Sequence, residues 1–115
     1  MEIEIYYEDV DGICLYDNES KYGISIDRDI EEKDFEMYEI LFVFFDDNEN
    51  NEIYEFALEI PNYLELIEEV VNLYGEYDNN ADYCTTEGFE CEINNFKNDK
   101  IKIATEILKI FMTYI

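Results

Sequence analysis

The sequence predicts a single α+β domain in which an antiparallel β-meander of about five strands packs with two α-helices. A chain of 115 residues fits one domain. Its first half alternates apolar and polar residues with the period of two that is typical of strands, and two later segments repeat apolar residues at helical spacing. Since 48% of the residues are apolar and 17% are aromatic, the chain has the material for a packed core.

The first three strands are predicted between turn signals. Ile3 and Ile5 alternate with glutamates, and a short apolar run over 13–16 follows the turn signal Asp11-Gly12. After a second turn, the residues over 22–27 again alternate between apolar and small or polar types. These patterns favour strands that pair with their neighbours in the chain.

The longest apolar run, over 37–45, predicts the central strand. Aromatic and β-branched residues dominate it, so we expect a strand that is buried on both faces. The polar stretch over 46–51 predicts a hairpin loop, and the alternation over 53–60 predicts a further strand.

The hairpin loop partly imitates a calcium-binding EF-hand. Asp46, Asn48 and Asn50 match its first three ligands. Asn51 stands where the turn glycine belongs, and Ala57 stands where the bidentate glutamate belongs. We therefore expect an ordinary hairpin loop and no metal site.

The first helix is predicted to begin at Pro61 and Asn62 and to end at Gly75. A loop over 76–88 and a short strand over 89–93 are expected to follow. The apolar residues at helical spacing in this first helix are Leu64, Ile67, Val71 and Tyr74.

Asp99 is expected to cap the last helix, which we expect to pack across the sheet. The apolar stripe of this helix is wide, so an alternative interpretation is that part of it forms a homodimer interface. The stripe has Ile101, Ala104, Leu108 and Phe111 on one face, with Ile103, Ile107 and Ile110 beside them.

The net charge is the strongest functional signal in the sequence. The chain has 31 acidic and 7 basic residues, a net charge of −24, whereas roughly 2 to 8 charges keep a small domain soluble. Residues 1–96 have a net charge of −26 and residues 97–115 a net charge of +2. Because crowded like charges oppose folding, we interpret the excess as functional. The alternative, a salt-adapted acidic surface, would be expected to extend through the last helix.

The composition argues against catalysis, cofactors and membranes. The chain has no histidine, and negative charges flank Cys14, Cys84 and Cys91, which we expect to be reduced core thiols. Its four glycines stand apart and form no phosphate-binding motif. The amino terminus resembles no signal peptide, no apolar run is long enough for a membrane span, and the charge repels anionic lipids. We expect a cytoplasmic, non-enzymatic protein.

The acidic surface is predicted to bind a basic protein and to repel nucleic acid itself. Alternate carboxylates on one strand, such as Glu90 and Glu92, would lie roughly 6.6 to 6.8 Å apart and imitate a phosphate backbone. Tyrosines beside acids would stack on arginines of the partner, unless they serve only in packing. The candidate partner-binding residues are Glu8, Asp9, Asp11, Asp27, Asp29, Glu31, Glu32, Asp46, Asp47, Glu49, Glu76, Tyr77, Asp78, Asp82 and Tyr83.

In its size, acidity and interspersed tyrosines over residues 1–96, the chain resembles the small acidic DNA-mimic inhibitors of phages and mobile elements, including many anti-CRISPR proteins. The resemblance implies a stoichiometric inhibitor that covers the nucleic-acid site of a CRISPR effector or another bacterial defence enzyme. An immunity protein that neutralises a basic nuclease toxin is the first alternative. An acidic protein-interaction or dimerisation module is the second.

Overall fold

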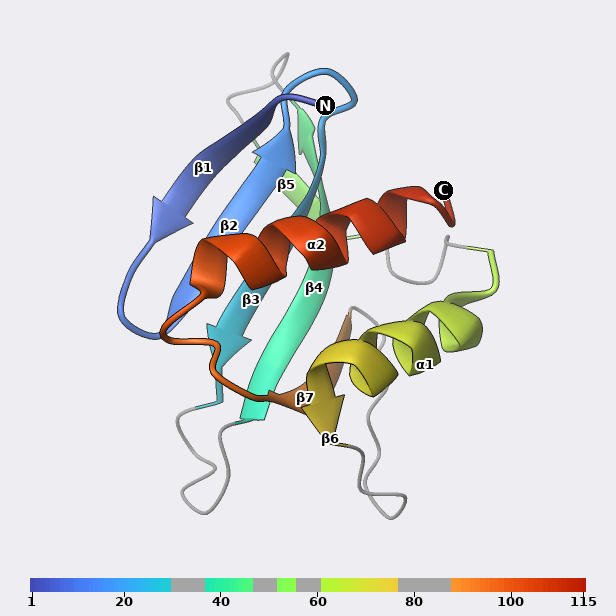
Figure 1. Cartoon of the computed structure of the whole chain (residues 1–115). Coiled ribbons are helices and arrows are strands. Elements are labelled where there is room, and N and C mark those ends of the chain that lie inside the picture. The colour runs from blue at the N-terminus through green and yellow to red at the C-terminus, as the bar shows by residue number, and fades with distance from the viewer. Residues whose placement is uncertain (30–36, 47–51, 56–60, 77–87) are drawn as a thin grey trace.

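The computed structural model describes residues 1–29, 37–46, 52–55, 61–76 and 88–115, which form one α+β domain (Figure 1). The predicted fold class is confirmed, and so are both predicted helices. The elements are β1 (Ile3–Glu8), β2 (Gly12–Asp17), β3 (Tyr22–Arg28), β4 (Met37–Asp46), β5 (Glu52–Glu55), α1 (Tyr63–Tyr74), β6 (Gly75–Glu76), β7 (Gly88–Ile93) and α2 (Lys100–Met112).

The sheet is antiparallel throughout and is assembled on β4. Its strands lie in the order β1-β2-β3-β4-β7-β6, and β5 pairs with the end of β4. The 10 residues of β4 are long enough to pair with β3 on one side and with both β7 and β5 on the other. β1 to β5 form the predicted meander, and β7 and β6 extend it.

The prediction of a loop over 76–88 is wrong at its start. Gly75 and Glu76 form the short strand β6, which pairs with Ile93 and Glu92 of β7. The chain leaves α1 directly along the free edge of β7, so its backbone groups find partners there. Residues 77–87 lie outside the described part of the chain.

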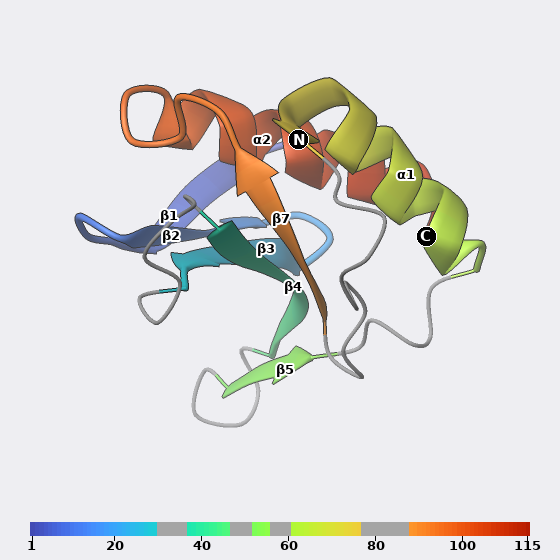
Figure 2. The ribbon, with the colours of Figure 1, turned by 90° about the horizontal axis from the view of Figure 1, so that it is seen from below.

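Both helices cover the same face of the sheet (Figure 2). The alternate side chains of β2, β3 and β4 that point to this face, such as Leu15, Ile24 and Ile40, are fully buried. α2 lies across these strands and contributes Ala104 and Phe111 to the same core. The last helix therefore packs across the sheet, as predicted.

Three details of the helices differ from the prediction. Leu64 is 68% exposed and Ile101 is 48% exposed, because each lies at the border of its helix's buried face and just inside the first turn. Asp99 precedes α2 but makes no side-chain cap hydrogen bond. Its backbone φ of −130° and ψ of 32° differ from the extended conformation from which a capping side chain reaches back to the helix.

Burial of β4 on both faces is confirmed only toward its end. Val43 and Phe45 point away from the helices and are nevertheless buried. Phe45 stacks on Tyr16, with ring centroids 4.7 Å apart, and this contact crosses Gly23 of β3. At the start of β4, Glu39 and Leu41 on the same face are half-buried.

Gly23 is required by this close packing. A Cβ atom at this position would lie 2.5 Å from the carbonyl oxygen of Leu15 and 2.9 Å from Cβ of Tyr16. The backbone contact cannot be relieved by a rotamer change. We expect Gly23→Ala to lower the free energy of unfolding by about 1 to 3 kcal/mol, measured by urea denaturation. An unchanged denaturation midpoint would contradict this packing.

Asp17 is a buried carboxylate that closes the turn between β2 and β3. Its Oδ1 accepts the backbone N–H of Glu2 at 2.9 Å, and its Oδ2 accepts the hydroxyl of Ser20 at 2.7 Å and the backbone N–H of Ser20 at 3.1 Å. Burial opposes ionisation of Asp17, but these hydrogen bonds outweigh it and lower the pKa to about 2. Asp17 thus joins the start of the chain to the β2–β3 turn.

Asp17→Asn should lower the free energy of unfolding by about 2 kcal/mol at neutral pH, because the amide replaces one acceptor oxygen with a donor. Because the pKa of Asp17 is lowered on folding, its ionised carboxylate stabilises the fold at pH values above the ordinary pKa of 3.8. This contribution to stability disappears as the pH falls toward 2. The difference between wild type and variant in denaturant titrations should therefore shrink between pH 4 and pH 2. Asp99→Asn, which removes no cap bond, is the matched control and should change stability little.

Candidate functional site

The structure brings five of the predicted partner-binding residues to one end of the sheet. Glu8, Asp9 and Asp11 lie in and beside the turn between β1 and β2. Asp27 and Asp29 lie at the end of β3, where the backbone N–H of the intervening arginine donates to the carbonyl oxygen of Asp11 at 2.8 Å. Residues that are distant in sequence therefore form one acidic cluster.

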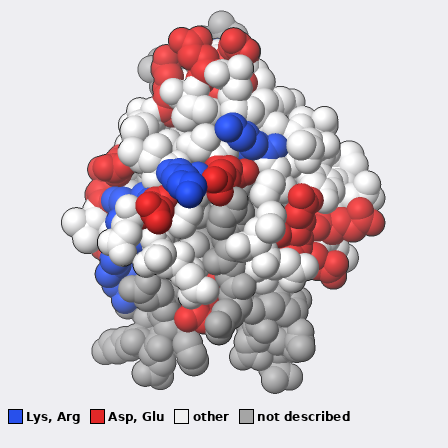
Figure 3. All heavy atoms as spheres, viewed as in Figure 1, with Lys and Arg blue, Asp and Glu red and all other residues white. Residues whose placement is uncertain are grey.

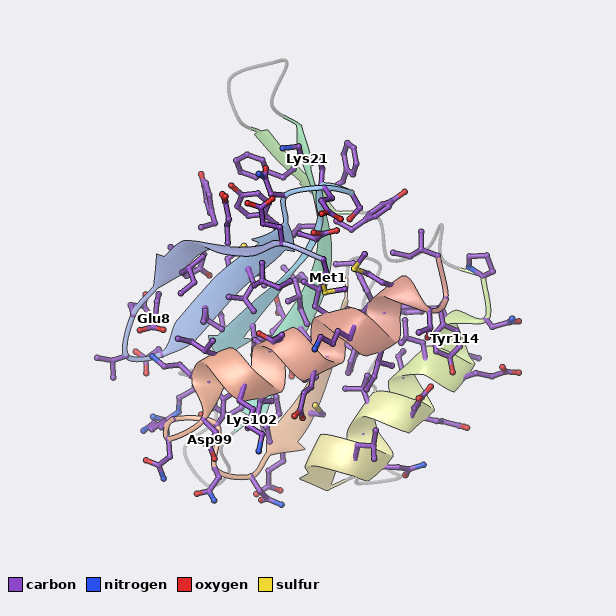
Figure 4. All side chains as sticks on the ribbon, turned by 45° about the horizontal axis from the view of Figure 1, so that its top comes forward. Met1, Glu8, Lys21, Asp99, Lys102 and Tyr114 are labelled. Carbon is purple, nitrogen blue, oxygen red and sulfur yellow. The ribbon has the colours of Figure 1, made fainter. Side chains whose placement is uncertain are left out.

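Lysines from the start of α2 adjoin this cluster. The Nζ of Lys100 donates to the backbone carbonyl oxygen of Asp9. Glu8 also lines a shallow hollow of about 350 Å³ with Lys97 and Lys102 (Figure 4). Part of the negative potential at this end is therefore offset by neighbouring positive charge.

The other predicted residues do not join this cluster within the described chain. Asp46 ends β4 at the opposite end of the sheet from Met37, and Glu76 lies in β6 beyond β7. The structure therefore gives no single patch that contains all candidates. The remaining candidates, Glu31, Glu32, Asp47, Glu49, Tyr77, Asp78, Asp82 and Tyr83, lie outside the described residues.

A row of carboxylates crosses the sheet on its second face, the face that carries no described helix. Asp27 of β3 is directly opposite Glu39 of β4, which is directly opposite Glu90 of β7. We call these three residues the acid row. Adjacent strands are about 4.8 Å apart, and like charges placed directly opposite each other destabilise a sheet. Glu92 lies two residues further along β7 on the same face.

Sequence reasoning missed the central member of the acid row. Glu39 is the one acid inside the apolar run of β4, and this position indicates a side of the strand that reaches solvent. Its alignment with Asp27 and Glu90 depends on the pairing register of three strands. Register between distant strands cannot be read from a single sequence.

Asp27 is held by hydrogen bonds from the same face. Its Oδ2 accepts the hydroxyl of Tyr7 at 2.6 Å and the hydroxyl of Ser25 at 3.1 Å. Burial and the bond to Asp27 raise the pKa of Tyr7, so the phenol stays protonated and acts as a donor. Burial and the charge of Asp27 raise the pKa of Cys14 to about 12. Tyr7 and Ser25 therefore fix the carboxylate of Asp27 in place, and the Cys14 thiol beside it is not a thiolate nucleophile.

A second acidic surface lies on α1. Glu65, Glu68 and Glu69 are exposed, and no basic residue occupies the last turn of the helix (Figure 3). Tyr114 donates its hydroxyl to Glu69 at 2.6 Å. The three glutamates repel one another because residues three and four apart are neighbours on a helix. Their position opposite the apolar side of the helix was available from the sequence, but no prediction used it.

Aromatic residues gather beside the edge strand β1 on the second face, and Tyr6 of this strand is exposed. Tyr6 is 47% exposed and packs edge-on against Phe45, with ring centroids 5.2 Å apart. Tyr16 stacks on Phe45 and donates its hydroxyl to Glu4 at 2.5 Å. Tyr16 thus lies beside a carboxylate and Tyr6 is accessible to solvent, whereas stacking of tyrosines on arginines of a partner stays a prediction.

The buried thiols should not react in the folded protein. Cys14 and Cys91 are buried, and burial raises the pKa of Cys91 to about 12, as it does that of Cys14. We expect iodoacetamide at pH 8 to leave both residues unmodified in native protein and to modify both in denaturant. Mass spectrometry of proteolytic peptides measures each site separately. Rapid native labelling of either cysteine would contradict its burial.

Among the described residues, no group of three or more histidine, cysteine, aspartate or glutamate side chains is placed to hold a metal ion. No helix in the described part is both long and apolar enough to cross a membrane. Comparison with protein-family models, with curated proteins and with solved structures finds no match to this chain.

Proposed function

We propose that this chain is a stoichiometric protein inhibitor that binds the basic nucleic-acid-binding surface of a bacterial defence enzyme, such as a CRISPR effector. The observation that carries the proposal is the acid row of Asp27, Glu39 and Glu90 across three adjacent strands. A partner rich in lysine and arginine would relieve the repulsion within this row. The same partner surface would otherwise attract phosphates.

The second face supplies what such a partner requires. Its carboxylates are attached to paired strands, so their backbone is already ordered before a partner binds. Asp27 is fixed further by Tyr7 and Ser25. The lysines of α2 lie on the other side of the sheet from the acid row, so they do not neutralise it directly (Figure 2). Association is therefore expected to be fast and to weaken steeply as salt rises.

The immunity-protein alternative uses the same surface against a different basic protein. It predicts inhibition of a nuclease toxin in place of a defence enzyme. Both versions share the physical requirement of a basic groove, so the identity of the enzyme that is bound distinguishes them.

Glu39→Gln tests the acid row by separating stability from binding. Removing the central charge should raise the free energy of unfolding by about 0.2 to 1 kcal/mol, because two like-charge oppositions disappear. The same change should slow association with the basic partner by roughly three- to tenfold and make the salt dependence shallower. Glu68→Gln on α1 has the same net charge and is the matched control. Equal effects of the two variants on association would show that only total charge matters.

The inhibition itself is tested with the immobilised full chain and bacterial lysate at low and high salt. We expect retention of a nucleic-acid-binding enzyme that is released by added DNA or RNA. That enzyme, once purified, should lose activity at a one-to-one ratio with the chain. An enzyme that is captured but still binds its nucleic acid in the presence of the chain would contradict the proposal.

A further inference from the structure

β1 is an edge strand whose outer side is available for pairing. Within the described residues it pairs on one side only, with β2, and it forms the end of the sheet (Figure 1). Ile5 is 49% exposed and Tyr6 is 47% exposed, so this edge is accessible to solvent. Figure 4 labels Met1, which precedes this strand by two residues, and Glu8, at which it ends.

The hydrogen-bond pattern identifies the free main-chain groups. The N–H of Asn18 donates to the carbonyl oxygen of Glu2 at 2.8 Å, and Glu4 is opposite Tyr16 in the same register. Main-chain groups alternate in direction along an antiparallel strand. Those of Glu2 and Glu4 therefore point to β2, whereas those of Ile3 and Ile5 point to the open edge. The register shift between Ile5 and Tyr7 ends this regular stretch.

The side chains beside this edge specify the chemistry of an added strand. Glu4 lies on the second face, where it accepts the hydroxyl of Tyr16, and Tyr6 also contacts the aromatic cluster on that face. Ile3 and Ile5 point to the helix side, because they are opposite Asp17 and Leu15. An added strand would therefore place cations beside the carboxylate and the tyrosine on one face and apolar side chains beside the isoleucines on the other.

The same charges oppose pairing with a second copy. An antiparallel pair of β1 strands that used Ile3 and Ile5 would place Glu4 directly opposite Glu4 of the second copy. Like charges in that position disfavour the pair. Pairing of β1 with β1 of a second copy is therefore unfavourable, whereas pairing of β1 with a basic strand is favourable.

We propose that β1 docks an extended segment of the target by strand addition, and that this segment alternates lysine or arginine with apolar residues. The proposal deepens the proposed function, on which it rests for the identity of the partner. The outward main-chain groups of Ile3 and Ile5 can pair with such a segment. Charge complementarity favours a basic segment over a second copy of the chain.

The direct test uses the isotope-labelled full chain and two synthetic peptides of equal charge. The first alternates four lysines with three valines, and the second has the four lysines followed by the three valines. We expect the alternating peptide to slow amide hydrogen exchange at Ile3 and Ile5 by roughly tenfold or more, and the block peptide to leave it unchanged. Equal binding of both peptides without protection of these amides would overturn the proposal. Protection of the same amides without peptide, with a dimer in sedimentation, would also overturn it.

Ile5→Pro removes the outward N–H and keeps the ladder to β2, because proline is tolerated where an edge N–H faces solvent. We expect it to weaken binding of the alternating peptide by roughly tenfold, whereas Ile5→Val binds as wild type does. If Ile5→Pro does not fold, Ile3→Pro makes the same test at the other outward residue, and the exchange measurement on wild type decides independently.

The two proposals fail in different ways. Equal inhibition of the captured enzyme by wild type and Ile5→Pro, together with weaker inhibition by Glu39→Gln, would overturn docking at β1 and leave the proposed function supported. Specific binding of the alternating peptide, without inhibition of any nucleic-acid-binding enzyme, would overturn the proposed function and support docking at β1.

Discussion

The burial of one face of the sheet beneath α2 is the interaction on which the rest of this structure depends. With a net charge of −24, repulsion among carboxylates acts against compaction at neutral pH. The fully buried side chains between the sheet and the helices oppose that repulsion, and each large one contributes about 1.5 to 3 kcal/mol. The main core fills the face beneath the helices, and the second face has only a smaller buried cluster around Val43 and Phe45, so the rest of that face accommodates charge.

The position of α2 also decides which of the described acids have lysines as neighbours. The segment before and within its first turn carries Lys97, Lys100 and Lys102, and it lies beside the β1–β2 turn. The candidate acidic residues around Glu8 therefore have cations as neighbours. The acid row on the second face and the glutamates of α1 lie away from the start of α2 that carries these lysines (Figures 1 and 2). Local clustering in a sequence is thus a poor guide to net potential on a folded surface.

The sequence predicted the fold because its strand and helix periods are local properties. Alternation around Ile24 and the apolar run around Phe42 identified strands without knowledge of their neighbours. The acid row was not predictable in the same way, because Asp27, Glu39 and Glu90 meet only through the pairing of three strands. The failed cap at Asp99 and the exposure of Ile101 have a similar origin. The cap depends on the backbone conformation of Asp99 and the exposure of Ile101 on where the core begins along α2, and helical spacing alone fixes neither.

The described structure keeps several arrangements that weaken the isolated chain. Like charges are directly opposite in the acid row and neighbours on α1, and main-chain groups at Ile3 and Ile5 point away from the sheet. The like-charge arrangements are unfavourable alone, the outward main-chain groups of Ile3 and Ile5 meet water, and the proposed basic, extended partner would pair with all of them. A protein whose only requirement was solubility would gain stability from replacing Glu39 with a neutral side chain. The inhibitor proposal explains why a carboxylate at that position would be retained, since binding a partner that prefers the folded state offsets the repulsion.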